Sequence, residues 1–418
     1  MNVEVVTIGD ELLLGFTIDT NAAFLARELS AVGIGIARRS SVGDAAEDIA
    51  AAVQDALART GAVITTGGLG PTADDLTKPA IARIFGREME FDAAIWEALR
   101  VRWKSYGWPG EIPQTNRQQA YIPSGATMLP NRHGSAPGVW LEDSDHRWVA
   151  MLPGVPREMR GMFAEELLPR IVARQGGAGH VIVSRTLRTV GIGESALADL
   201  LGPLAKGPAG LPLAFLPGWE GVDLRLTSRG RDAATASRAL DAGSSALAAI
   251  AGSHVYGEDQ ADLAAVVLAL LRDRGMSFAV AESCTGGLLG ARITAIPGSS
   301  TVMRGGIIAY SDEVKRSQLA VREETLTAHG AVSEQTANEM ASGGRARLAA
   351  DVCASITGIA GPDGGTADKP VGTVCIAVDV QGALRSATTS LIGDREEIRR
   401  RSTQAALNLV RKALHAWP

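Results

Sequence analysis

The sequence is poor in the residues that build disulfide frameworks and zinc sites. Its 418 residues include three cysteines and six histidines. The histidines are scattered, with no two at metal-ligand spacing, and Cys284, Cys353 and Cys375 show no paired spacing. This usage fits a reducing compartment and excludes a zinc knuckle.

Long hydrophobic runs and strong basic charge are also absent. No apolar run is long enough to span a bilayer and no signal-like segment stands at the N-terminus, so we expect a cytoplasmic protein that binds no membrane. The net charge is −5, aromatic residues make up 4%, and Arg399-Arg400-Arg401 is the one basic block. This balance argues against nucleic acid as the main ligand.

The chain is long enough for two or three domains, and 46% of its residues are apolar, so each domain can bury a core. We predict domains over residues 1–172, 173–256 and 257–418, with a linker around residues 171–178. The first alternates strand and helix patterns, which predicts an α/β fold with a doubly wound parallel sheet. The order of strand and helix patterns in the middle segment predicts a small α+β domain with an antiparallel sheet. The last predicts a further α/β domain.

Glycines and carboxylates follow the predicted strands of the first domain. Ligands bind at the carboxyl ends of such strands. The glycines at positions 67, 68 and 70 let backbone N–H groups approach phosphate oxygens. Carboxylates without neighbouring Cys or His favour a hard cation, Mg²⁺ or Mn²⁺, for which we predict the ligands Asp10, Asp75 and Glu158. The competing interpretation is that Asp74 and Asp75 only complement a helix dipole.

The stretch Glu282-Ser283-Cys284-Thr285-Gly286-Gly287 lies between a short apolar strand pattern at residues 276–280 and a helix pattern at 288–296. Such a turn lifts a hydroxyl clear of the sheet and leaves N–H groups free at a helix start. We predict Ser283 as a nucleophile, with Thr285, Gly286 and Gly287 as N–H donors. The alternative is that Ser283 and Thr285 only cap the helix.

A serine nucleophile needs a base, and no histidine lies in a glycine-bearing motif here. Lys315 is the predicted base, provided that burial leaves it neutral part of the time, and Tyr310 would relay the proton. Cys284 is the rival nucleophile, although a small buried cysteine is the preferred interpretation.

A second glycine-rich stretch follows the strand pattern at residues 352–357. Thr357, Gly358 and Gly361 would line the substrate pocket. Arg395 and Arg399 are candidates for pairing with a substrate phosphate, but a solvated helix face is the favoured interpretation of both.

These motifs together resemble the CinA family of competence/damage-inducible proteins. In the first domain the resemblance rests on residues 9–12, 19–22, 66–77, 136–138 and 152–159. In the last it rests on residues 281–287, 297–300, 305–306 with Tyr310 and Lys315, 330–333, and 357–365 with 369–372.

The resemblance implies a molybdopterin-binding-like first domain that hydrolyses ADP-ribose with a divalent metal, and adds Asn21 as a substrate-binding residue. It implies a last domain that deamidates nicotinamide mononucleotide without a cofactor. Pro79 stands where the family usually has Glu, and Gln118 where it often has Lys.

Two alternatives stay open. One is a deamidase with a first domain that binds a pterin or nucleotide without turnover. The other is an interaction protein in DNA uptake or recombination. We expect nucleotide substrates and a homodimer.

Overall fold

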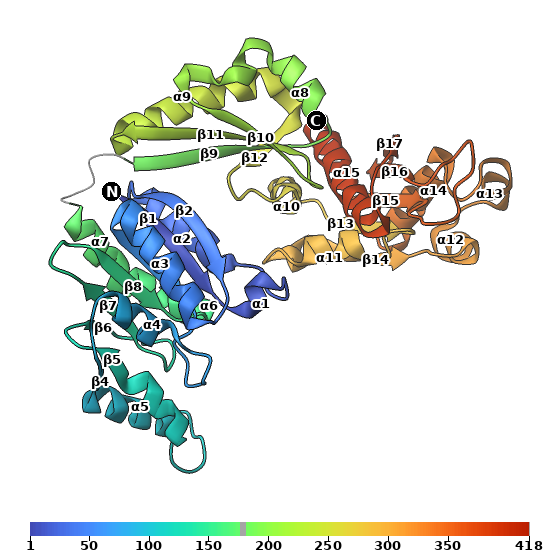
Figure 1. Cartoon of the computed structure of the whole chain (residues 1–418). Coiled ribbons are helices and arrows are strands. Elements are labelled where there is room, and N and C mark those ends of the chain that lie inside the picture. Colours follow the sequence, from blue (N-terminus) through green and yellow to red (C-terminus); the bar gives the residue numbers. More distant parts are fainter. Residues whose placement is uncertain (176–180, 418) are drawn as a thin grey trace. The chain divides into compact units, whose positions relative to one another are not determined.

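The computed structural model describes residues 1–175 and 181–417 (Figure 1). The chain divides into two compact units, Met1–Val183 with Ser228–Arg238, and Ser184–Thr227 with Ala239–Pro418. Most of the predicted middle domain is therefore grouped with the C-terminal part. The glycines of the predicted linker, Gly176 and Gly177, lie outside the described residues.

The first unit is built on a six-stranded sheet of order β2-β1-β3-β8-β7-β6. Strands β2, β1, β3 and β8 are parallel, and β7 and β6 continue the sheet antiparallel. The strands are β1 (Asn2–Ile8), β2 (Gly35–Val42), β3 (Ala62–Thr66), β6 (Thr127–Leu129), β7 (Gly138–Glu142) and β8 (Trp148–Leu152).

Helices cover both faces of this sheet, as expected for a doubly wound fold. On one face Val3 and Val5 pack with α2 and α6; on the other Val6 and Ile8 pack with α3 and α4. The helices are α1 (Asp10–Leu13), α2 (Thr20–Ala31), α3 (Ala46–Thr60), α4 (Thr77–Ile84), α5 (Ala93–Ser105), α6 (Pro156–Met162) and α7 (Leu168–Arg174), and β4 (Met89–Phe91) pairs with β5 (Tyr121–Pro123) near α5.

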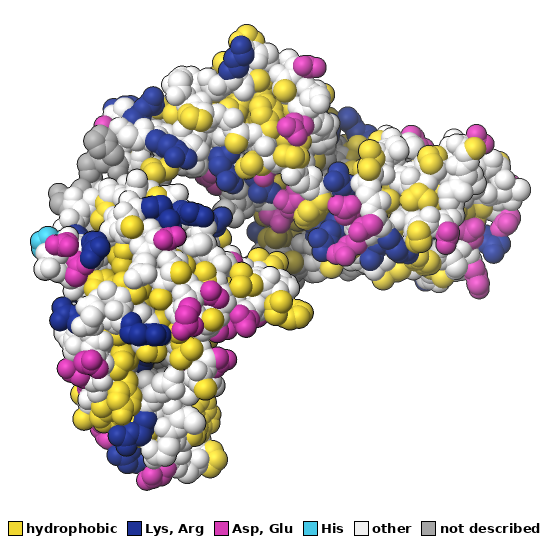
Figure 2. All heavy atoms as spheres, in the orientation of Figure 1, with side chains coloured by type: hydrophobic (Ala, Val, Ile, Leu, Met, Phe, Trp, Pro, Cys, Tyr) yellow, Lys and Arg dark blue, Asp and Glu magenta, His cyan; other side chains and the backbone are white. Residues whose placement is uncertain are grey.

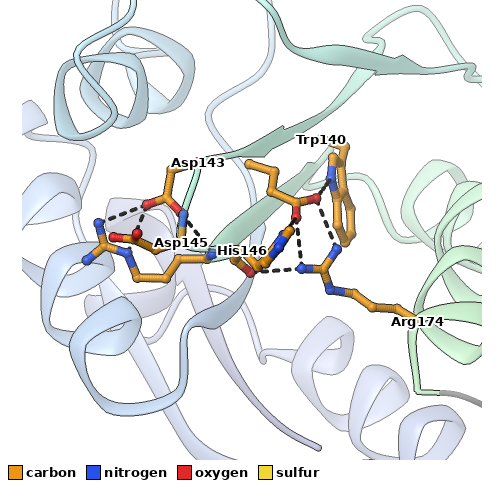
Figure 3. A network of polar contacts seen from close by, with 7 residues as sticks. Trp140, Asp143, Asp145, His146 and Arg174 are labelled. Carbon is orange, nitrogen blue, oxygen red and sulfur yellow. Dashed lines mark hydrogen bonds and ion pairs between the residues drawn. The ribbon is translucent and has the colours of Figure 1, made fainter.

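A polar network fixes the amino end of β8 (Figure 3). The predicted ligand edge is at the other end of the strands. Arg174 on α7 donates two hydrogen bonds to the Glu142 carboxylate, at 3.0 and 2.8 Å. Burial alone would raise the pKa of Glu142, but the bonds from Arg174 and His146 lower it overall. Asp143 accepts from Arg147 in the same turn. The network ties α7 to the β7–β8 hairpin and has a structural role.

The middle segment forms a four-stranded sheet of order β10-β11-β9-β12. The pairs β10–β11 and β12–β9 are antiparallel, as predicted. Its elements are β9 (Val181–Thr189), α8 (Glu194–Leu201), β10 (Leu213–Pro217), β11 (Val222–Arg231), α9 (Ala233–Ala251) and β12 (Val255–Glu258).

The C-terminal part carries a five-stranded sheet of order β14-β13-β15-β16-β17. Strand β13 is parallel to both β14 and β15, whereas β16 and β17 are antiparallel. The elements are α10 (Leu263–Asp273), β13 (Phe278–Glu282), α11 (Leu288–Thr294), β14 (Met303–Ile308), α12 (Asp312–Leu319), α13 (Glu323–His329), α14 (Glu334–Arg347), β15 (Val352–Gly358), β16 (Thr373–Val380), β17 (Ala383–Ser390) and α15 (Arg395–His415).

Alternation along β13 explains why this sheet has helices on both faces. Phe278 and Val280 point into a core with α10, α11 and α15. Ala279 and Ala281 point into a second core against α12 and α14. A capping box of Asp394 and Glu397 opens α15 and fixes where this long helix begins.

Candidate active sites at two strand-end edges

The parallel strands of the first unit end together at one edge of the sheet. The Gly9 N–H donates to the Val42 carbonyl at 3.0 Å, and the Gly67 N–H donates to the Leu152 carbonyl at 3.1 Å. The segments that follow β1, β2, β3 and β8 therefore meet. Since β2 and β3 lie on opposite sides of β1, the edge includes a topological switch point, where doubly wound folds bind ligands.

Gly67 and Gly68 are required by the turn that follows β3. Their φ angles are +106° and +65°, a region that favours glycine. A methyl group on Gly67 would lie 2.1 Å from the Ile8 carbonyl oxygen, and one on Gly68 2.1 Å from the Thr77 hydroxyl. The N–H of Gly70 is bound by Asp75 at 2.7 Å. The turn is thus built for close backbone packing.

The three carboxylates predicted as metal ligands lie in three separate networks. Asp10 accepts from the Asp44 N–H, and Asp75 accepts from the N–H groups of Gly70 and Thr72. Glu158 is held by the Asn131 amide. Over residues 1–175 and 181–417, no three His, Cys, Asp or Glu side chains are placed to hold a metal ion. The predicted ligand set does not fit a metal in this structure, so no step is derived through one.

Asp44 also follows a strand of this sheet, but it was not among the predicted metal ligands. Its N–H and carboxylate exchange hydrogen bonds with Asp10. Burial raises the pKa of Asp44, and the charges of Asp10, Glu11 and Asp74 raise it further. Figure 2 shows acidic side chains gathered near α1, beside hydrophobic ones. The edge is therefore acidic.

Two buried polar side chains complete this edge. Asn21 donates to the Gly154 carbonyl at 2.7 Å, and its own Oδ1 is buried with no partner among the residues that the structure describes. Lys78, almost fully buried, donates to the carbonyls of Gln118 and Gln119 at 3.0 Å. Burial lowers the pKa of Lys78 to about 8, although Asp75 acts in the opposite direction. Sequence reasoning noted Lys78 only beside Pro79 and gave it no role.

Ser283 lies at the corresponding edge of the C-terminal sheet. It follows β13 directly, and its N–H donates to the Ile356 carbonyl of β15 at 2.9 Å. On the other side the Ala309 N–H, just beyond β14, donates to the Glu282 carbonyl at 2.7 Å. Ser283 therefore sits between the ends of β14 and β15, 8% exposed.

Glu282 organises the turn that follows. Its fully buried carboxylate accepts the N–H groups of Gly287, Leu289 and Gly290 at 2.8–3.1 Å. The Gly286 N–H donates to the Ser283 carbonyl. Two of the three predicted N–H donors are thus already bonded, contrary to expectation. Within the described residues the Thr285 N–H has no partner, and its hydroxyl is buried without one.

Lys315 is buried at the same edge, with 2% of its surface exposed. Its Nζ lies 3.3 Å from the Tyr310 carbonyl oxygen and 3.2 Å from the Asp312 carboxylate. The Tyr310 hydroxyl instead accepts a hydrogen bond from Arg395 at 2.9 Å. The predicted relay through the Tyr310 hydroxyl is therefore not arranged in this structure.

The rival nucleophile, Cys284, is in an unfavourable setting for attack. Burial raises the pKa of its thiol to about 12, Glu282 adds to this, and Arg395 and Arg399 oppose it. The reactive species is the thiolate, which is scarce at neutral pH under these conditions. The environment favours the serine hydroxyl.

Arg395 is exposed, as the favoured interpretation expected, whereas Arg399 is half-buried and contacts the Ser283 turn. Arg399 donates to the Thr285 carbonyl at 2.8 Å, inside the Ser283 turn. Arg395 donates to the Gly361 carbonyl and to Tyr310. The guanidinium groups of Arg395 and Arg399 therefore lie at the strand-end edge.

The other predicted pocket residues serve the frame of this edge. The Thr357 hydroxyl donates to the Ala331 carbonyl at 2.7 Å. A methyl group on Gly358 would lie 2.9 Å from the Thr373 carbonyl oxygen, and one on Gly361 2.7 Å from Val371. These glycines allow the loop after β15 to pack closely against β16.

Comparison with known proteins identifies the chain. The CinA-like protein of Gemmatimonas aurantiaca is 59% identical over 413 residues, which are 99% of this chain and 96% of the relative. The chain belongs to the CinA family. A putative competence-damage inducible protein of Symbiobacterium thermophilum is 41% identical over 423 residues, 99% of each chain.

Three sequence-family models match successive segments of this CinA-family chain. They are a probable molybdopterin binding domain at residues 4–173, the damage-inducible protein CinA KH domain at 184–257 and the CinA C-terminal domain at 260–414. Among solved structures, the competence damage-inducible protein A of Klebsiella pneumoniae is 38% identical, with 37% of this chain and 97% of that one covered and a TM-score of 0.37.

No helix in the described parts of the chain combines the length and hydropathy needed to cross a membrane.

Proposed function

We propose that the C-terminal domain hydrolyses the carboxamide of nicotinamide mononucleotide to nicotinic acid mononucleotide and ammonia. The Ser283 Oγ attacks the amide carbon, and the C–N bond breaks as the nitrogen takes up a proton and leaves as ammonia. Water then attacks the resulting ester: its oxygen bonds to the acyl carbon, the bond to Oγ breaks, and one water proton returns to Ser283. The carboxylic acid leaves and loses its proton to solvent.

The observation that carries the proposal is the position of Ser283. Its side chain stands at a strand-to-helix turn, between two neighbouring strand ends, with Lys315 and two arginines at the same edge. Lys315 is the group that accepts the serine proton in this proposal, and its contacts with Tyr310 and Asp312 fix the amine in place. The Thr285 N–H is the donor left for the developing oxyanion.

Charge at the edge supports an anionic substrate. Arg395 and Arg399 add two guanidinium groups beside the turn, and arginine suits phosphate recognition by geometry as well as charge. The phosphate of the mononucleotide would therefore bind on the α15 side of Ser283.

The test is to incubate the purified protein with nicotinamide mononucleotide and to measure ammonia and nicotinic acid mononucleotide together. Equal amounts of both products are expected, and none from Ser283→Ala. The absence of ammonia from well-folded wild-type protein would overturn the proposal.

For the N-terminal domain we propose binding of a phosphate-bearing nucleotide or pterin at the turn that Gly67 and Gly68 form. Metal-dependent hydrolysis of ADP-ribose remains a prediction, since the ligand set Asp10, Asp75 and Glu158 is dispersed. Release of AMP from ADP-ribose in Mg²⁺ or Mn²⁺, abolished by a chelator, would establish turnover. Binding without AMP release would favour the non-hydrolytic alternative.

A further inference from the structure

We propose a second ligand site in the second unit, for a phosphate-bearing nucleotide, in the cavity between α15 and the turn that opens α8. The cavity has a volume of about 850 Å³, within the range of small-molecule sites. The turn Gly191–Glu194, the hairpin loop at residues 217–222 and α15 residues between Glu397 and Lys412 line it.

Contacts made by α15 and α11 hold the walls together. Gln404 on α15 donates to the Glu220 carbonyl at 2.9 Å. The Arg292 guanidinium lies 5.1 Å from the centre of the Trp219 ring. The cavity is therefore a built feature of this unit.

Arg401 is an unpaired cation in the cavity wall. Its Nε is buried without a hydrogen-bond partner, and within the described residues its guanidinium makes no ion pair. Its neighbour Arg400 is instead paired with Glu396. A partly buried charge without a partner is costly, and an anionic ligand would remove that cost.

Asn408 adds a second donor. Its side chain is 8% exposed, and its Oδ1 accepts a hydrogen bond from Arg411 at 2.9 Å. Since arginine can only donate, Oδ1 must face Arg411, which leaves Nδ2 on the other side. This Nδ2 lies close to Gly191, since a methyl group built on Gly191 would be 2.9 Å from it. In the described parts of the chain Nδ2 makes no hydrogen bond.

The turn before α8 supplies further donors. Gly193 is the residue at the helix start and provides no side-chain cap. The N–H groups of the first turn are thus open to an acceptor. Together with Arg401 and Asn408 they present an excess of donors, which matches the oxygens of a phosphate.

The remaining lining residues favour a nucleoside over a bare anion. Glu220 is paired with Arg188, and the Glu397 carboxylate accepts the Asp394 N–H in the cap of α15, so both carboxylates already have partners. Glu194 has no partner in the described residues and can accept from hydroxyl groups of a sugar. The apolar wall of Ile192, Leu391 and Leu409 would cover a ring.

The test is isothermal titration of AMP into the full-length Ser283→Ala protein. AMP has no carboxamide, so its binding does not depend on the proposed deamidase. Saturable binding is expected at millimolar AMP or below, and Arg401→Met should weaken it at least tenfold. Arg347→Met, the same change at an exposed arginine on α14, should leave it unchanged.

Asn408→Leu provides a second variant, checked for folding by thermal melting, and should also weaken AMP at least tenfold. Unchanged affinity in Arg401→Met would place AMP elsewhere in the chain and overturn the proposal. Absence of saturable binding would do the same. If inorganic phosphate binds as tightly as AMP, the proposal that the cavity also recognises the nucleoside is refuted.

Discussion

The two strand-end edges share a topology and differ in charge. At the edge of the first unit, burial and, after it, the charges of Asp10, Glu11 and Asp74 raise the pKa of Asp44. At the edge of the C-terminal sheet, Arg399 donates to the Thr285 carbonyl in the serine turn, and Lys315 and Arg395 contact Tyr310 just beyond β14. At the first edge the buried Lys78 is outnumbered by carboxylates, whereas the second edge presents basic groups to an anionic ligand.

This difference teaches where chemistry can proceed with the residues present. Basic groups at a strand end can bind a phosphate and stabilise an oxyanion without a cofactor. Clustered carboxylates repel a phosphate and need a cation before they can bind one.

Lys315→Met should have the largest effect on the basic edge. The substitution keeps the buried aliphatic chain but removes the amine. A general base contributes roughly 10²–10⁴-fold to the rate. We expect kcat for ammonia release to fall by at least about 100-fold. Lys206→Met, at an exposed lysine, serves as the control. A loss confined to KM would assign Lys315 to substrate binding instead.

Glu282→Ala should destabilise the C-terminal domain. It leaves three buried N–H groups without their carboxylate, and hydrogen bonds to a charged group contribute about 1.5–3 kcal/mol each. A loss of about 3 kcal/mol in the free energy of unfolding is expected from chemical denaturation. Glu324→Ala, on the exposed surface of α13, should change little. Equal effects of the two would show that Glu282 does not organise the turn.

Arg399→Met tests the phosphate side of the basic edge. Loss of a charge-assisted contact should raise KM for nicotinamide mononucleotide about 10-fold or more. Nicotinamide riboside, which lacks the phosphate, should be turned over equally by wild type and variant. If the turnover of both substrates falls equally, Arg399 binds the Thr285 carbonyl and does not contact the phosphate.

Lys78 gives the acidic edge a pH dependence of stability. Burial lowers its pKa to about 8 from 10.5, so the folded state resists protonation. The resulting penalty is fully present below pH 8 and disappears as the pH rises toward 10.5. The free energy of unfolding should therefore rise by roughly 1–2 kcal/mol between pH 7.5 and 9.5.

Tryptophan fluorescence during urea unfolding can follow this change, because Trp96, Trp103, Trp108, Trp140 and Trp148 all lie in the first unit. The pH-dependent rise should be missing in Lys78→Met. A rise of the same size in that variant would mean that another group titrates.

Sequence patterns predicted the parts of the fold that depend on local order. Alternating strand and helix segments predicted the doubly wound sheet, and the apolar run before Ser283 predicted a strand–turn–helix. The exposed edge strand β17 and the α5 insertion were not predicted, because their patterns lack a fully buried face.

The candidate sites were predicted less completely, for reasons of packing. Asp44 follows β2 as Asp10 follows β1, so their proximity was readable from the parallel pairing. The contact between Glu158 and Asn131 could not be predicted in this way, since it depends on the conformation of a loop. Arg395 and Arg399 share a helix face by their spacing of four, but only the docking of α15 beside the turn shows that this face meets Thr285.

The central claim is that the hydroxyl of Ser283 cleaves the carboxamide while the neighbouring thiol takes no part. The direct measurement is ammonia release from nicotinamide mononucleotide by Ser283→Ala and Cys284→Ala, side by side with wild type. The account predicts no detectable release from the first and a rate within about threefold of wild type from the second. Activity retained without the hydroxyl and lost without the thiol would contradict it.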